Sequence, residues 1–159
     1  MSDSPAQSWG VASLETLRSM SGLAFLQAIR DGRLPSPPIS RVLAFRLIEV
    51  EQGRAVFEGT PGADHYNPIG SVHGGYAATL LDSCMGCAVQ SMLPQGSGYT
   101  TLEIKISMIR AISHDTGIVR AEGKVLSVGR RVGTAEGRLV DGAGRLLAHG
   151  TTTCLVMEL

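Results

Sequence analysis

Hydrophobic residues recur at near-helical spacing close to the start of the chain and then give way to a proline-rich stretch. The helical set lies between residues 14 and 29: Leu17, Met20, Leu23, Ala24 and Ala28. This spacing predicts one amphipathic helix, which we expect Asp31-Gly32 to end. Residues 34–40, LPSPPIS, predict an extended connector, because proline fits poorly inside a helix.

A second helix is predicted after the polar loop at residues 65–73. A long run of small and apolar residues begins at Gly74, with no proline until Pro94. Such residues are mostly good helix formers. Because a helix that is apolar nearly all round is normally buried, we expect this one to lie inside the fold.

Strands are predicted on both sides of this long helix. Leu102, Ile104, Ile106 and Met108 alternate with polar residues, which is the period of a half-buried strand. The strands are expected at residues 42–50, 54–60, 102–108, 119–125, 134–140 and 145–156, the last two flanking a hairpin-like turn from Asp141 to Gly144. One buried helix between early and late antiparallel strands predicts an α+β fold.

Asp82 is the only charged residue in the long apolar run and is therefore the first candidate for chemistry. A buried carboxylate costs several kcal/mol unless it is paired or used, as expected for a buried ion. A structural role, as a hydrogen-bond acceptor or ion-pair partner in the core, is the competing interpretation.

The residues before the long helix favour the chemical role. Gly74 and Gly75 follow His73 and leave backbone N–H groups open at the helix N-terminus, where the partial positive charge suits an oxyanion. We expect His73 to position the loop or the Asn67 side chain rather than act as a general base. Asn67 precedes Pro68, so it either stabilises a turn or holds the substrate carbonyl or the attacking water.

The spacing of these groups predicts a dimer. Gly74 and Asp82 are eight residues apart, which is roughly 12 Å along a helix. One carbonyl group cannot touch both of them in the same chain. If both serve one reaction, two such helices run antiparallel across a two-fold axis and form two equivalent sites.

The segment from Asn67 to Asp82 resembles the PaaI-type acyl-CoA thioesterases of the hotdog superfamily. The matching motif residues are Asn67, Gly70, His73, Gly74, Gly75 and Asp82, and similar stretches continue at residues 100–112 and 124–156. The resemblance covers roughly residues 40–157. It implies a long central helix wrapped by a curved antiparallel sheet, with protomers paired into dimers that often form tetramers.

The resemblance also implies roles for individual residues. Asp82 would act as general base on water or as nucleophile, and Thr101 would orient the water. The thioester oxygen would sit at the N–H of Gly75, or that of Gly74, of the opposite protomer. The remaining implied groups are Arg130 and Arg131, with Lys124 upstream, for the CoA phosphates, and Leu81 and Met85 for the acyl pocket. Thioester hydrolysis needs neither a metal nor a redox cofactor.

Composition excludes several other classes. The chain has 14 basic and 14 acidic residues and few aromatic ones, so no charged field favours nucleic acid or a membrane surface. Cys84 and Cys87 form a C-x-x-C without the second pair of a zinc site. Together with Cys154, they fit reduced thiols in a cytoplasmic protein. No Gly-x-Ser-x-Gly, phosphate loop or dinucleotide motif is present, and no signal peptide is apparent.

We therefore expect residues 1–39 to form a helical extension and a proline-rich connector, and residues 40–159 a hotdog thioesterase domain acting on a small aryl- or medium-chain acyl-CoA. Three alternatives remain open. A hotdog hydratase or dehydratase would use its acid–base residues differently, and an acyl-CoA-binding module would bind without turnover. A structural or interaction protein would leave the carboxylate of Asp82 unexplained.

Overall fold

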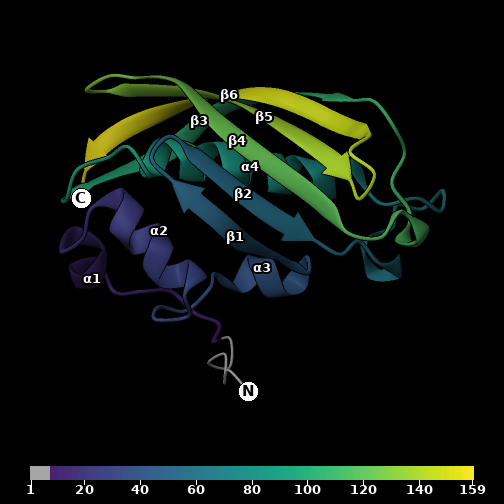
Figure 1. The fold of residues 1–159 in the computed structure, drawn as a ribbon, viewed down its shortest axis with the longest axis horizontal. Coiled ribbons are helices and arrows are strands. Elements are labelled where there is room, and N and C mark those ends of the chain that lie inside the picture. Colours follow the sequence, from purple (N-terminus) through teal and green to yellow (C-terminus); the bar gives the residue numbers. More distant parts are fainter. Residues whose placement is uncertain (1–7) are drawn as a thin grey trace.

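A curved antiparallel sheet covers one long helix, and three short helices precede it (Figure 1). The computed structural model describes residues 8–159. The helices are α1 (Leu14–Arg18), α2 (Gly22–Arg30), α3 (Pro38–Val42) and α4 (Gly74–Gln90), and the strands are β1 (Phe45–Glu51), β2 (Arg54–Gly59), β3 (Ser97–Met108), β4 (Val119–Val128), β5 (Val132–Asp141) and β6 (Leu146–Glu158). The expected α+β hotdog layout is confirmed.

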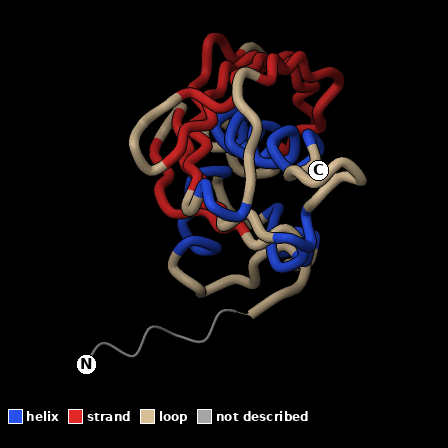
Figure 2. Tube along the Cα trace, turned by 90° about the vertical axis from the view of Figure 1, so that its right-hand side faces the viewer, coloured by secondary structure: helices blue, strands red, loops and turns tan. Residues whose placement is uncertain are grey.

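The six strands form a single sheet in the order β1-β2-β4-β5-β6-β3. Every neighbouring pair is antiparallel, and β1 and β3 are the two edge strands. The predicted turn between β5 and β6 is confirmed: Asp141 Oδ1 accepts hydrogen bonds from the backbone N–H groups of Ala143 at 3.0 Å and Arg145 at 2.9 Å. Figure 2 shows the strands arching over the long helix.

A row of glycines lets α4 lie close against the sheet. Gly123 pairs with Gly137 across β4 and β5, and Gly137 pairs with Gly150 of β6. A methyl group on Gly123 would collide with the backbone carbonyl of Cys84 in α4. The side chains of α4 that face the sheet are fully buried: Leu80, Leu81, Cys84, Met85, Ala88 and Val89. The core therefore lies between α4 and the middle of the sheet.

The N-terminal extension differs from the prediction in two places. The expected single helix is two helices, because Ser19 ends α1 and Ser21 begins α2 by accepting a hydrogen bond from the N–H of Ala24 at 3.3 Å. The expected connector contains α3, with Pro38 at its first position, where a missing N–H costs nothing. Residues 1–7 of the predicted extension lie outside the described residues.

The extension is fixed to the end of α4. The N–H of Gly22, the first residue of α2, donates to the carbonyl of Leu93 at 3.0 Å. A side chain on Gly22 would collide with the backbone of Gln90. The start of α2 therefore meets the carbonyl end of α4, an arrangement that suits both helix dipoles.

Strand β3 also differs from the prediction. Its alternating hydrophobic residues were predicted to be half buried, but Leu102 is 58% exposed and Met108 is 52% exposed. The reason is its position, because β3 is an edge strand of the sheet that residues 8–159 form. No helix within residues 8–159 has the length and hydropathy needed to span a membrane.

Candidate active site

The loop before α4 is shaped by the side chain of Asn67. Its Oδ1 accepts hydrogen bonds from the N–H groups of Ile69 at 3.1 Å and Ser71 at 3.2 Å, and its Nδ2 donates to Ser71 Oγ at 3.0 Å. Gly70 completes the turn with a φ of 89°, in the left-handed region that favours glycine. The structure thus shows Asn67 holding the turn, one of the two roles left open by the sequence.

His73 caps the N-terminus of α4. Its Nδ1 accepts a hydrogen bond from the N–H of Gly75 at 2.8 Å. This contact requires an acceptor lone pair on Nδ1. His73 thus contacts the backbone at the helix terminus and not Asn67. Its positioning role in the reaction stays a prediction.

This cap decides which backbone donor is available. The N–H of Gly75 is already bound to His73. The N–H of Gly74 has no hydrogen-bond partner within residues 8–159, as is usual for the first residue of a helix. Of the two donors that the sequence left open, the structure favours Gly74 as the one that can bind an oxyanion.

Gly74 borders an apolar pocket of about 260 Å³. The pocket is formed by the start of α4, the end of β3 with the residues that follow it, and β6; its lining residues are Val72, His73, Gly74, Ala77, Met108, Ile109, Arg110, Ala111, Ile112, Leu147 and Ala148. Most of these side chains are hydrophobic. A helix N-terminus beside an apolar pocket can bind a polar head and an apolar tail together.

Asp82 is partly buried and is held by β3. The hydroxyl of Thr101 donates to Asp82 Oδ1 at 2.8 Å, so the structure brings these two predicted residues together. No donor to the second carboxylate oxygen is found in residues 8–159. That oxygen can accept a proton or attack a carbon atom without first breaking a protein contact.

A bulge in β3 makes the contact with Thr101 possible. Thr101 pairs with Cys154 and Glu103 with Thr153, so Leu102 is an extra residue between two aligned pairs. The bulge reverses the alternation of side chains. As a result Thr101 faces Asp82, while Ile106 packs against the core and Met108 lies near Gly74.

Sequence reasoning missed Tyr99, which lies near Asp82 together with the thiols of Cys84 and Cys87. Burial raises the pKa of Cys87 to about 12, and the negative charge of Asp82 adds to the shift. Burial also raises the pKa of Cys84 and of Tyr99 far above their ordinary values. The cysteines are unpaired, and such raised pKa values keep them as unreactive thiols. Gly86 was the available signal, because a side chain there would overlap the Tyr99 ring.

Gly74 and Asp82 lie on one uninterrupted helix. Their separation along its axis is therefore roughly 12 Å, at about 1.5 Å per residue. Within one chain, the free N–H and the carboxylate cannot contact the same carbonyl group. The structure therefore keeps the separation from which the sequence predicted a site shared by two chains.

The predicted basic residues do not form one group. Arg130 and Arg131, in the turn between β4 and β5, line a cavity of about 500 Å³ with hydrophobic residues from the end of α4 and from β6. Lys124 does not line this cavity, because it points from β4 into an ion pair with Glu122 at 2.8 Å. Arg54 binds the same carboxylate at 2.7 Å.

Leu81 and Met85 face the sheet. Both are fully buried, and Gly137 of β5 lies directly beneath them. In the described chain they belong to the core and line neither the pocket beside Gly74 nor the cavity at Arg130. Their assignment to an acyl pocket stays a prediction, and Ala77 and Met108 are better placed to line one.

Comparisons with known proteins agree with this architecture. A sequence profile of the Thioesterase superfamily matches residues 69–148. A Halobacterium salinarum protein named as an esterase is 40% identical over 84 residues, which are 52% of this chain and 54% of that protein. The chain thus spans about half the length of this curated relative.

Two solved structures are similar over most of the fold. A Ralstonia eutropha JMP134 protein, named a putative thioesterase and phenylacetic acid degradation-related protein, is 26% identical with a TM-score of 0.75, covering 82% of this chain and 98% of its own. A mutant of the phenylacetic acid degradation protein PaaI from Thermus thermophilus is 27% identical with a TM-score of 0.67, covering 74% and 97%. The chain belongs to the Thioesterase superfamily.

Proposed function

We propose that this protein is an acyl-CoA thioesterase that hydrolyses a small aryl- or medium-chain acyl-CoA to the free acid and CoA. The observation that carries the proposal is that α4 presents two open polar groups. Its carboxylate, Asp82, is held through one oxygen by Thr101 and leaves the other open. The same helix presents the unpaired N–H of Gly74 beside an apolar pocket. A base or nucleophile and an oxyanion donor are the two groups that thioester hydrolysis needs.

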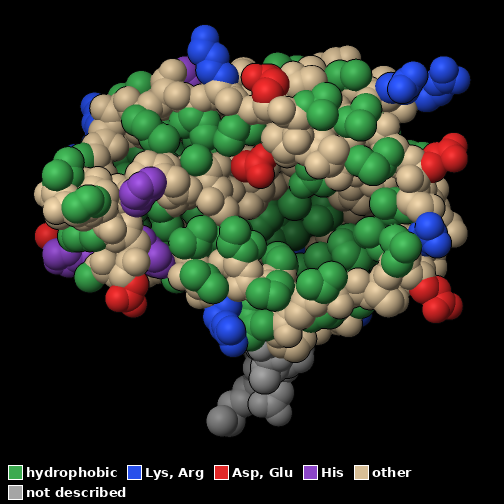
Figure 3. All heavy atoms as spheres, turned by 180° about the vertical axis from the view of Figure 1, so that it is seen from behind, with side chains coloured by type: hydrophobic (Ala, Val, Ile, Leu, Met, Phe, Trp, Pro, Cys, Tyr) green, Lys and Arg blue, Asp and Glu red, His purple; other side chains and the backbone are tan. Residues whose placement is uncertain are grey.

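The site is completed by a second copy of the chain. Two α4 helices run antiparallel across a two-fold axis, so that Asp82 of one subunit meets Gly74 of the partner subunit. The outer edge of β3 supports this arrangement, since no strand within residues 8–159 pairs with it and its exposed side chains include Leu102, Ile104 and Met108. The face opposite to the view of Figure 1, where the sheet does not cover α4, is hollowed and rich in hydrophobic side chains (Figure 3). Association of these dimers into tetramers stays a prediction.

In the general-base route, Asp82 takes a proton from water, and the resulting hydroxide oxygen bonds to the thioester carbonyl carbon. The carbonyl electrons move to oxygen, where the N–H of Gly74 of the partner subunit donates a hydrogen bond. When the carbonyl re-forms, the C–S bond breaks and the thiolate leaves, taking the proton from Asp82. In the nucleophile route, the carboxylate attacks the carbon itself, the C–S bond breaks and the CoA thiolate leaves. Water then hydrolyses the anhydride to the free acid and the Asp82 carboxylate, and its remaining proton goes to the thiolate. Both routes use the same residues.

The substrate would extend in two directions from the thioester. The apolar pocket beside Gly74 suits a hydrophobic acyl group. Arg130 and Arg131 line a cavity at the other end of α4, where exposed guanidinium groups can bind phosphates. The phenylacetic acid degradation named for two similar structures supports an aryl acyl group. The unpaired cysteines support the expected cytoplasmic location.

A thiol-release assay over a panel of acyl-CoAs tests the proposal, with Asp82→Asn as the matched variant of equal size. We expect free CoA from at least one acyl-CoA and a loss of roughly 10²-fold or more in the variant. Enoyl hydration without thiol release would identify a hydratase. Binding without turnover would identify a binding module. Either result, or full activity of a folded Asp82→Asn protein, contradicts the proposal.

A further inference from the structure

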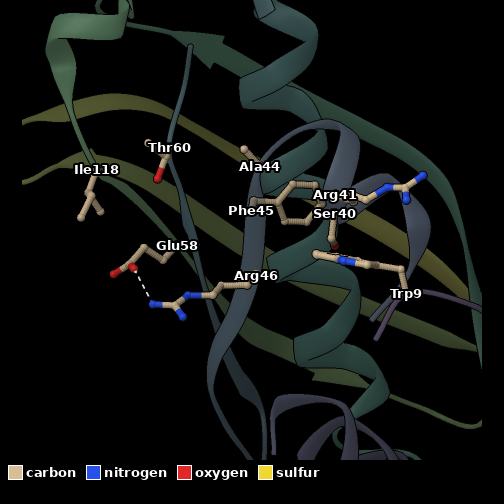
Figure 4. Close-up of a pocket in the computed structure, with 9 residues that line it drawn as sticks. All are labelled: Trp9, Ser40, Arg41, Ala44, Phe45, Arg46, Glu58, Thr60 and Ile118. Atoms are coloured by element: carbon tan, nitrogen blue, oxygen red, sulfur yellow. Dashed lines mark hydrogen bonds and ion pairs between the residues drawn. The ribbon is translucent and has the colours of Figure 1, made fainter. Parts of the chain in front are cut away.

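A pocket of about 430 Å³ lies on the N-terminal side of the fold, between the first described residues, α3 and the β1-β2 hairpin (Figure 4). Backbone pairing builds one wall. The N–H of Ser36 donates to Ser8 O at 2.9 Å, and the N–H of Gly10 donates to Ser36 O at 3.0 Å. This pairing sets Trp9 over the pocket, where its ring lies next to Ser40 (Figure 4).

The charged side chains around this pocket leave a positive excess. Glu58 is its only acidic residue, and two guanidinium groups already bind that carboxylate: Arg46 at 3.1 Å and Arg120 at 3.2 Å. These contacts, that of Arg46 first, lower the pKa of Glu58, so the carboxylate stays ionised. Arg41 also lines the pocket and has no ion-pair partner within residues 8–159. Among the lining residues, two arginines therefore stand against one carboxylate, and Arg120 binds that carboxylate from outside the lining.

The neutral polar groups of the pocket are hydrogen-bond donors in need of a partner. Ser40 is only 2% exposed, and its hydroxyl has no hydrogen bond in the described part of the chain. The indole N–H of Trp9 likewise has no acceptor among residues 8–159. The hydrophobic part of the lining comes from Trp9, Phe45 and Ile118. Hydrogen-bond donors that have no acceptor in the described protein, beside an excess of positive charge, suit an anion.

We infer that this pocket is a second ligand site, which binds an organic anion whose carboxylate or phosphate is attached to a flat apolar ring. Arg41 and the Ser40 hydroxyl bind the anionic group, and the ring lies against Trp9. The cavity is within the range of roughly 300–1,000 Å³ typical of small-molecule sites. None of its lining residues belongs to the proposed catalytic group, so the inference does not depend on the thioesterase activity.

Trp9 is the only tryptophan of the chain, so its fluorescence reports on this pocket directly. We would titrate the full-length protein at constant ionic strength with phenylacetate, AMP and inorganic phosphate. We expect a saturable change of Trp9 fluorescence with phenylacetate or with AMP. The probe that binds more tightly identifies a carboxylate or a nucleotide phosphate as the source of the anion. Inorganic phosphate should bind at least tenfold more weakly, about 1.4 kcal/mol, because it lacks the ring.

Three variants make the result specific. Arg41→Ala should weaken binding at least tenfold. Arg18→Ala, which removes an exposed arginine of α1 outside the pocket, and Asp82→Asn should leave binding unchanged. The inference is overturned by the absence of saturation with both organic probes, by inorganic phosphate binding as tightly as AMP, or by wild-type affinity in Arg41→Ala. Loss of the signal in Asp82→Asn would also overturn it, because the signal would then come from the proposed active site.

Discussion

Replacing Gly74 by proline should remove the oxyanion donor while keeping the helix. Gly74 is the first residue of α4, a position where proline is favoured because its N–H is not used by the helix. His73 has φ −59° and ψ 137°, which is the conformation that a residue before proline prefers. The substitution therefore replaces the N–H at the reacting carbonyl with a ring methylene and is compatible with the local backbone.

The expected loss follows from the role of a single donor. Removing one oxyanion-hole hydrogen bond typically lowers kcat by roughly 10²–10³-fold, about 2.7–4 kcal/mol of transition-state stabilisation. KM should change little, because the hydrogen bond strengthens mainly in the transition state. The measurement is steady-state thiol release, accompanied by thermal unfolding to verify the fold.

Gly74→Ala is the matched control. It keeps the N–H, and its methyl group would lie 3.4 Å from Met108 Cε, the flexible end of a side chain. We expect this variant to retain most of its activity. A folded Gly74→Pro protein with the kcat of Gly74→Ala would refute the assignment of the donor and return attention to Gly75.

Three further predictions concern the carboxylate, the packing of α4 and the acid stability of the fold. Thr101→Val should lower kcat in thiol-release assays, with rescue by Thr101→Ser, because the Thr101 hydroxyl donates to Asp82, the proposed base or nucleophile. Equal rates in both variants would argue against this role. Gly123→Ala should lower the free energy of unfolding, measured in urea, by about 1–3 kcal/mol, because the added methyl group overpacks against α4. Gly142→Ala, in the open β5-β6 turn, should have little effect. Equal stability of the two variants would contradict the close packing of Gly123 against α4. Hydrogen bonds from the N–H of Arg145, and then from its side chain, lower the pKa of Asp141 in the folded protein. The ionised carboxylate therefore stabilises the fold above its unfolded pKa, and this contribution to the free energy of unfolding is lost as the pH falls below about 4. Asp141→Asn should reduce the loss of stability at acid pH, and an unchanged pH dependence would contradict the assignment.

The sequence predicted the strands and α4 well because their signals are local. Alternation and the absence of proline located α4 and the strands after it. The extension was harder to predict, since Ser19 and Ser21 compete for backbone hydrogen bonds and split one apolar period into two helices. The bulge at Leu102 has no glycine or proline to indicate it, and it depends on pairing with β6.

The sequence indicated candidate residues for the site but not their atomic contacts. Asp82 was identified because a lone carboxylate in an apolar helix is conspicuous, and Thr101 is indeed beside it. Which glycine offers its N–H depends on the rotamer of His73, which no pattern encodes. Met85 was harder to place, because a helix that is apolar on all sides does not show which side faces the sheet.

The most direct test of the central claim, that two chains share each site, is to mix two inactive variants. Asp82→Asn and Gly74→Pro proteins are combined, their subunits are exchanged, and heterodimer formation is verified by native mass spectrometry. In a mixed dimer one of the two sites receives an intact Asp82 and an intact Gly74. With random mixing about half of the dimers are mixed, so the account predicts recovery to roughly a quarter of wild-type thiol release. No recovery despite verified exchange would contradict it, because each chain would then build its site alone.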